Sequence, residues 1–193
     1  MKKVIIEQYD PAWAEEFKLA KASLEIILKD VQYISIEHVG STSIPGLPAK
    51  PVIDIDIIIK PSSLVATRAA LVSAGYTDCG EMDVLGRHIY RQPGFGKHQG
   101  AFGERTADGG LRRNTYAMIE GCASLRNHLD VKRVLLEDAA LKEEYGALKC
   151  ALADREFEGI GAYSAEKSNV LRKILRKAGW SEEDFAPVKP ANS

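Results

Sequence analysis

The stretch PVIDIDIII, residues 51–59, constrains the fold more than any other because two aspartates lie inside an otherwise aliphatic run. Successive side chains of a strand point to opposite faces, so the alternating isoleucines of this stretch share one face. An all-isoleucine face predicts a strand that packs on a hydrophobic core. Asp54 and Asp56 share the opposite face, where the two side chains leave the backbone about 6.6 Å apart.

Two ionised carboxylates at this spacing repel each other and raise each other's pKa unless a positive charge lies between them. A magnesium or manganese ion would remove that cost, and magnesium in proteins is commonly held by one or two carboxylates together with substrate phosphates. The alternative is that Asp54 and Asp56 point to solvent from a half-exposed strand. The spacing alone leaves both interpretations open.

The loop GSTSIPG, residues 40–46, comes directly before this strand. Gly40 allows the backbone to approach a phosphate closely, and Ser41 adds a hydroxyl, with Ser43 as a further phosphate-binding candidate. The spacing is not that of a P-loop, and a plain connecting loop is the alternative. A phosphate-binding turn next to a carboxylate pair is, however, the equipment that phosphoryl or nucleotidyl transfer requires.

The remaining segments predict an α/β or α+β domain with a helical C-terminal part. Hydrophobic spacing and end signals favour helices over 10–29 and 62–75, and strands over 32–39, 87–92 and 114–121. Helical spacing then dominates 124–138, 139–157 and 164–179, and a glycine-rich stretch over 93–110 reads as a substrate-facing or mobile loop. We therefore expect an α/β core over 1–121, a helical region over 122–186 packed on it, and a disordered tail over 187–193.

The charge balance limits the partners of the 193-residue chain. Lys and Arg number 26 against 27 Asp and Glu, a formal net charge of −1, so the sequence gives no strong nucleic-acid signal and an anionic ligand needs a local site. No apolar run approaches the roughly 20 residues of a membrane span, so we expect no membrane partner. The three cysteines are dispersed and form no C-x-x-C pair, which fits a cytoplasmic protein.

The motif HVGSTSIPGLPAKPVIDI, residues 38–55, closely resembles the signature of the GrpB family, an uncharacterised family placed in the nucleotidyltransferase superfamily. The resemblance continues in EGCASLRNHL, EEYGALKCALA and YSAEKSNVLRKIL, and so covers most of the chain. It implies a nucleotidyltransferase-like mixed β-sheet flanked by helices. By similarity Gly40 and Ser41 match the superfamily's turn, Asp54 and Asp56 match its metal pair, and Lys50 is a phosphate partner.

The chain departs from the expected pattern in two places. The superfamily places a third carboxylate on a later strand, whereas NTYAMI contains no acidic residue, and Asn114 or Thr115 stands where that carboxylate is expected. The family also tends to show an aromatic-Arg-Asp run after NHL, which this chain replaces with Val131, Lys132 and Arg133. The first departure leaves a full two-metal site open.

Several other side chains have two interpretations. His38 is either a ligand-orienting group or, as its strand face favours, a packed and hydrogen-bonded histidine. Tyr163 and Lys167 either reach toward the sheet or pack between helices. The basic residues around the glycine-rich stretch are either an anion-steering surface or a solvated basic loop, namely Arg87, Arg91, Lys97, Arg105, Arg112 and Arg113.

The resulting hypothesis is a metal-dependent nucleotidyltransferase that moves a nucleotidyl group from a nucleoside triphosphate to an unknown acceptor. Asp54 and Asp56 would be the catalytic, metal-binding pair for Mg²⁺ or Mn²⁺, and Gly40, Ser41 and Lys50 would hold the phosphates. A non-catalytic nucleotide- or partner-binding module with a degenerate site is the alternative. A metal-dependent phosphohydrolase is a third interpretation, which release of phosphate rather than pyrophosphate would identify.

Overall fold

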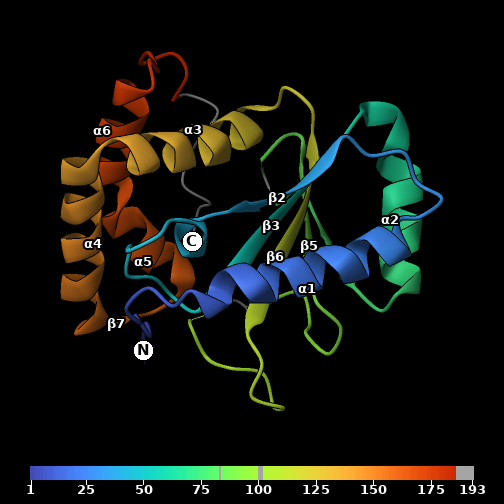
Figure 1. Cartoon of the computed structure of the whole chain (residues 1–193), viewed down its shortest axis with the longest axis horizontal. Helices are drawn as coiled ribbons and strands as arrows, with labels where there is room; N and C mark the ends of the chain where they lie inside the picture. The colour runs from blue at the N-terminus through green and yellow to red at the C-terminus, as the bar shows by residue number, and fades with distance from the viewer. Residues whose placement is uncertain (83, 100–101, 186–193) are drawn as a thin grey trace.

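A five-stranded mixed sheet and six α-helices make up the fold in the computed structural model, which describes residues 1–82, 84–99 and 102–185 (Figure 1). The strands are β1 (Lys2–Lys3), β2 (Ser35–Val39), β3 (Val52–Ile59), β4 (Thr77–Gly80), β5 (Arg87–Arg91), β6 (Arg112–Ile119) and β7 (Glu156–Phe157). The helices are α1 (Ala12–Ile27), α2 (Leu64–Ser73), α3 (Ala123–Glu137), α4 (Ala139–Ala153), α5 (Ile160–Glu166) and α6 (Ser168–Lys177).

The large sheet has the order β2-β3-β6-β5-β4, with β3 and β6 parallel and every other neighbouring pair antiparallel. The register places Asp54 of β3 beside Asn114 of β6, and Asn114 in turn beside Arg91 of β5. A separate two-stranded sheet joins β1 to β7, which binds the first residues of the chain to its C-terminal third. The aspartate-bearing strand is therefore central in the sheet, with a neighbour on each side.

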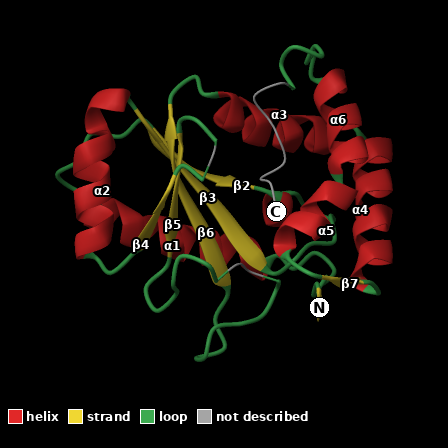
Figure 2. Cartoon of the chain, turned by 180° about the vertical axis from the view of Figure 1, so that it is seen from behind, coloured by secondary structure: helices red, strands yellow, loops and turns green. Residues whose placement is uncertain are grey.

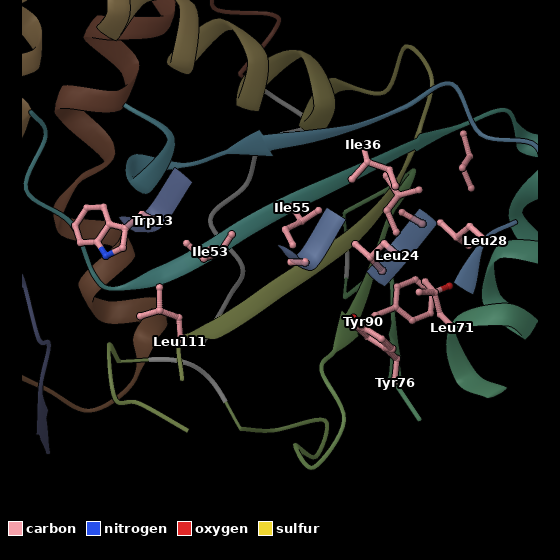
Figure 3. Packing of buried hydrophobic residues seen from close by; sticks show 14 of the residues in the cluster. Trp13, Leu24, Leu28, Ile36, Ile53, Ile55, Leu71, Tyr76, Tyr90 and Leu111 are labelled. Carbon is pink, nitrogen blue, oxygen red and sulfur yellow. The ribbon is translucent and has the colours of Figure 1, made fainter. Parts of the chain in front are cut away.

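The isoleucine face of β3 is the core that the sequence predicts. Ile53 and Ile55 are fully buried against α1, together with Trp13 and Leu24 (Figure 3). The helix begins where the Asp10 carboxylate accepts a hydrogen bond from the Ala12 amide at 2.9 Å, as expected for a residue that favours helix starts. Burial of each large aliphatic side chain stabilises the fold by about 1.5–3 kcal/mol, so this face fixes the orientation of β3.

The opposite face of the sheet lies toward the C-terminal helices. Leu125 of α3 packs on Ile58 and Met118, which lie on the aspartate side of β3 and β6. Ile44 and Leu47, from the turn before β3, enter a second cluster formed with α3, α4 and α6. Figure 2 shows α3, α4, α5 and α6 gathered on one side of the molecule, with α2 at the other end. The helical region thus covers the side of the sheet that carries the aspartates.

The mixed α/β sheet with flanking helices and a helical C-terminal region is confirmed. The segment 164–179, expected as one helix, falls partly in α5 and mainly in α6, which are separate helices that meet at Lys167, and the small sheet of β1 and β7 was not predicted. The division into 1–121 and 122–186 stays a prediction, and the expected tail over 187–193 lies outside the described residues. Within the described part of the chain, none of the helices has the length and apolar character of a membrane span.

Candidate functional site

Gly40 joins β2 to a one-turn 3-10 helix, η1 (Ser41–Ser43), and brings the backbone against Asp54. Its φ of 69° is a left-handed conformation that side chains rarely adopt, and a Cβ at this position would collide with the Asp54 carboxylate. The Ser43 hydroxyl donates to the Gly40 carbonyl at 2.7 Å, and the Thr42 hydroxyl donates to the Val52 carbonyl at 3.1 Å. These bonds fix the turn beside the carboxylate, whereas the sequence-based role of Gly40 in phosphate binding stays a prediction.

Asp54 is held between a glycine backbone and an amide. The Asn114 side-chain amide donates to the Asp54 carboxylate at 2.9 Å, and the Asn114 carbonyl accepts from the Arg91 guanidinium at 3.0 Å. Burial raises the pKa of Asp54, although the hydrogen bond from Asn114 and the charge of Lys50 oppose this rise. Asn114 therefore occupies the position where a third carboxylate was expected, and it supplies a neutral donor.

Asp56 lies one alternation further along β3 and is fully buried. Both of its oxygens contact Nδ1 of His128 from α3, at 2.9 and 3.1 Å. Burial lowers the pKa of His128, but the charge and hydrogen bond of Asp56 outweigh it, so the pKa is raised above its usual value. The Tyr116 ring meets the imidazole edge-on, with centroids 5.6 Å apart. His128 thus supplies the ring nitrogen that contacts both oxygens of this buried carboxylate.

Three buried or half-buried lysines, which we call the lysine cluster, come together from distant segments: Lys50 before β3, Lys149 on α4 and Lys167 between α5 and α6. Burial and the neighbouring charge of Lys167 lower the pKa of Lys50 to about 8, and burial lowers that of Lys167 to about 8. Burial lowers the pKa of Lys149 well below its usual value. The cluster is therefore a group of three lysine amines at one cavity whose pKa values are lowered by burial.

Lys149 is the most enclosed member of the cluster, with 2% of its surface exposed. Its ammonium nitrogen lies 4.5 Å from the Tyr145 ring centroid and has no hydrogen-bond partner among the described residues. The Lys167 nitrogen lies 4.3 Å from the Tyr163 ring centroid, and the Tyr145 hydroxyl hydrogen-bonds with Ser41. Tyr145 therefore contacts both Lys149 and the turn that follows β2.

These groups line one cavity of about 410 Å³ between the sheet and the helical region. The predicted residues Gly40, Ser41, Lys50 and Asp54 line it, whereas Ser43 and Asp56 do not. The other polar or charged side chains of its wall are Thr42, Arg87, Arg91, Asn114, Tyr116, His128, Tyr145, Lys149, Tyr163, Ser164 and Lys167. Among the described residues that line the cavity, Asp54 is thus the carboxylate and the lysines and arginines are the basic groups.

The other sequence candidates divide clearly. Tyr163 and Lys167 line the cavity. His38 is a packed histidine that stacks on Phe17 and is hydrogen-bonded to Thr42. Burial and the charge of Lys132 lower the pKa of His38 to about 4. Within the basic group, Arg87 and Arg91 line the cavity, while Arg105 pairs with Glu7, and Arg112 pairs with Glu104 and lies 3.7 Å from the Phe95 ring centroid.

Sequence reasoning missed His128, Tyr145 and Lys149. His128 lies in the NHL motif and Lys149 in EEYGALKCALA, which were read as supporting a resemblance and as helical spacing. A lysine on the apolar stripe of a helix, one turn after Tyr145, was the available signal, because a buried lysine is rare without a partner.

Few of the side chains at the cavity are suited to hold a metal ion. Among the described residues no group of three or more His, Cys, Asp or Glu side chains is placed to hold a metal ion. Asp54 faces the cavity, Asp56 is engaged by His128, and Asn114 stands in place of a further carboxylate. This set fits one magnesium ion held chiefly by Asp54 and by ligand oxygens better than it fits a pair of ions.

A mixed α/β sheet with a polar cavity between its carboxylate-bearing strand and a helical region defines the class of this protein. Over residues 3–177 the chain matches the GrpB protein family, and it belongs to that family. It is similar to the UPF0157 protein SCO7215 of Streptomyces coelicolor, with 31% identity over 90% of this chain and 83% of that protein.

A solved structure of the same family agrees with this assignment. The conserved protein GrpB from Enterococcus faecalis aligns with a TM-score of 0.71 at 27% identity, covering 91% of this chain and all of that one. A weaker structural similarity, with a TM-score of 0.42 at 13% identity, is found with the Cid1 poly(U) polymerase over 73% of this chain and 44% of that chain.

Proposed function

We propose that the cavity binds a nucleoside triphosphate with Mg²⁺ and that the protein transfers the nucleotidyl group to an acceptor. The observation that carries this proposal is the convergence of the lysine cluster, the Gly40–Ser41 turn and the Asp54 carboxylate on one 410 Å³ cavity. A triphosphate is the ligand that needs several cations, backbone approach and a metal-holding carboxylate in one place.

The lysine cluster would hold the terminal phosphates. Lys149 provides an amine that is almost fully buried and has no hydrogen-bond partner among the described residues. A phosphate oxygen would supply the missing acceptor and the negative charge that returns Lys149 to its charged form. Gly40 lets the backbone lie directly against the Asp54 carboxylate, because even a methyl group there would collide with it.

Asp54 would hold the magnesium ion, and Asp56 would join it where the ion displaces His128. When bound, magnesium neutralises phosphate charge and aligns the reacting groups. Asn114 orients the Asp54 carboxylate through its amide, and Lys50 and Lys167 offset the negative charge of the departing pyrophosphate. The bond formed joins an acceptor oxygen to the α-phosphorus, and the bond broken releases pyrophosphate.

A second candidate is a nucleotide-binding module without turnover, which Asn114 specifically favours. Its amide donates to Asp54 at the place where the superfamily pattern has a third carboxylate, and a neutral amide cannot accept the acceptor's proton. In this second candidate the cavity binds the phosphates of a nucleotide but the protein does not transfer the nucleotidyl group.

The test is calorimetric titration of the four nucleoside triphosphates, each with and without magnesium, followed by assay for pyrophosphate and phosphate. We expect magnesium-dependent binding that Asp54→Asn and Lys149→Gln each weaken by about tenfold or more, since a hydrogen bond to a charged group is worth about 1.5–3 kcal/mol. Lys173→Gln is the matched control, because Lys173 lies on exposed α6 surface paired with Glu144.

The products separate the candidates. Pyrophosphate release supports nucleotidyl transfer, binding without either product supports the module, and phosphate release supports a phosphohydrolase. If no nucleotide binds at millimolar concentration, the proposal fails.

A further inference from the structure

We propose that Arg87 and Arg91 form a second anion site in the cavity, which binds a phosphate or carboxylate group of the acceptor. The identification of the bound molecule as the acceptor rests on the proposed function, whereas the existence of the anion site does not. The proposal starts from two arginines on one strand that line the cavity apart from the lysine cluster.

The strand places both arginines on the same face. Arg87 and Arg91 are four residues apart in β5, so both side chains leave the cavity side of the sheet about 13 Å apart. Arg91 lies in register with Asn114, next to Asp54, and Arg87 lies in register with Met118, further along the sheet. The arginines therefore extend the basic wall past Asp54.

The lysine cluster lies in the other direction. Lys50 precedes β3, and Lys149 and Lys167 come from the helices, so the cluster gathers near the beginning of that strand. Asp54 stands between the cluster and Arg87 along the strand. A ligand held at its phosphates by the lysines and a second ligand held by Arg87 would thus meet at Asp54.

The hydrogen bonding of the arginines indicates what kind of group they bind. The Nε atoms of Arg87 and Arg91 are both buried, and neither has a hydrogen-bond partner among the described residues. Among the described residues, the Arg91 guanidinium donates a hydrogen bond to the neutral Asn114 side-chain carbonyl. A buried N–H without an acceptor is costly, so the site requires oxygens that a ligand would bring.

The geometry favours an oxyanion over a stacked base. An Nε–H lies in the plane of the guanidinium group, so a ring stacked on the guanidinium face would leave it unsatisfied, while phosphate and carboxylate oxygens accept in that plane. The Arg87 guanidinium carbon also lies over the Tyr116 ring, 6.0 Å from its centroid. The ligand class that fits is a small molecule or chain end that carries a phosphate or a carboxylate.

The experiment titrates inorganic phosphate and, separately, acetate into the full chain by calorimetry, first alone and then with a non-hydrolysable triphosphate analogue and magnesium already bound. We expect an anion to bind in both conditions, and Arg87→Gln and Arg91→Gln each to weaken that binding by about tenfold. The probe that binds more tightly identifies phosphate or carboxylate as the preferred group.

Two control variants distinguish a specific loss of anion binding from a general effect of removing an arginine and from a loss of stability. Arg113→Gln is the matched arginine control, since Arg113 lies on β6 with its side chain on the other face of the sheet. Arg87→Lys keeps the charge but loses the in-plane Nε donor, so we expect it to weaken binding while the melting temperature stays near that of the wild type.

Two outcomes would overturn the proposal. One is anion binding that both arginine variants leave unchanged, and the other is loss of all anion binding once the analogue is bound, which would mean a single shared site. If no nucleotide analogue binds, the proposed function fails, while the titrations without analogue still decide whether the arginines form an anion site.

Discussion

Lys149 carries a charge or loses it according to what lies beside it. Its nitrogen is buried against Tyr145, and the positive neighbours Lys50 and Lys167 oppose its protonation. An empty cavity therefore favours the neutral amine, and an anion favours the ammonium. At the residue scale, the burial of Lys149 in this GrpB protein lowers the stability of the fold, and the proposed binding of an anion beside Lys149 would offset that cost.

The pH dependence of stability tests this interpretation. The pKa of Lys149 is lowered in the folded state, so the unfolded chain binds more protons and stability rises with pH up to the unfolded value of about 10.4. We expect Lys149→Met to raise the free energy of unfolding at pH 7 by about 1.4 kcal/mol for each unit by which the pKa is lowered. The difference in the free energy of unfolding between Lys149→Met and the wild type should become smaller as the pH approaches 11.

Urea unfolding of the wild type and of Lys149→Met at several pH values measures this difference. Lys173→Met is the control, because an exposed lysine should give a difference that does not change with pH. A constant gap between the Lys149→Met variant and the wild type across the pH range would contradict the prediction.

At the scale of single elements, the turn between β2 and β3 and the strand β3 set the site together. The turn brings Gly40 against Asp54, while the isoleucine face of β3 prevents the strand from rotating or slipping, since a one-residue slip would bury the carboxylates in the core. The position of Asp54 is thus determined by the hydrophobic side of its own strand.

Two glycines of this connection form a matched pair. Gly40 and Gly46 both have positive φ, of 69° and 77°, so alanine at either position should cost about 1–2 kcal/mol of stability. Gly46 has open space around it, whereas a Cβ at Gly40 would meet Asp54. We expect Gly40→Ala to destabilise the protein more than Gly46→Ala in urea unfolding, and to abolish nucleotide binding. Equal effects of the two substitutions would show that Asp54 does not depend on the turn.

The sequence predicts the elements that depend on local pattern. The alternation of β3 and the glycine that ends β2 each act within a few residues, and each is found where the pattern indicates. The break at Lys167 was not predicted because the hydrophobic spacing on both sides of it is helical. Strands β1 and β7 have two residues each, which is too short to show alternation.

In the candidate site, too, the residues close in sequence were predicted and the residues brought in from distant helices were not. Gly40, Ser41 and Asp54 are close in sequence and were predicted together, and they line the same cavity. His128 and Lys149 reach that cavity from helices far along the chain, so their role depends on packing that no local pattern contains.

At the scale of the whole molecule, the cavity has one wall from the sheet and another from the helical region. Asp54 and Arg91 belong to the first, and Lys149 and Lys167 to the second. A ligand that contacts both walls stabilises their association, because it binds the folded state and not the unfolded chain.

Calorimetric melting measures this coupling. We expect a triphosphate analogue with magnesium, at a hundred times its Kd, to stabilise the wild type by about 2.7 kcal/mol and to raise the temperature of a single transition. Lys167→Gln should reduce the shift and Lys173→Gln should not. A separate transition of the helical region that the analogue leaves in place would contradict the prediction.

The pairing of Lys2 with Phe157 bears on how the molecule is made. Strand β1 is synthesised before its partner β7, which leaves the ribosome only after the large sheet, α3 and α4 have been synthesised. At about 5–20 residues per second, roughly eight to thirty seconds pass between the synthesis of β1 and that of β7. The pairing of β1 with β7 therefore forms only after the segments of the large sheet, α3 and α4 have been made.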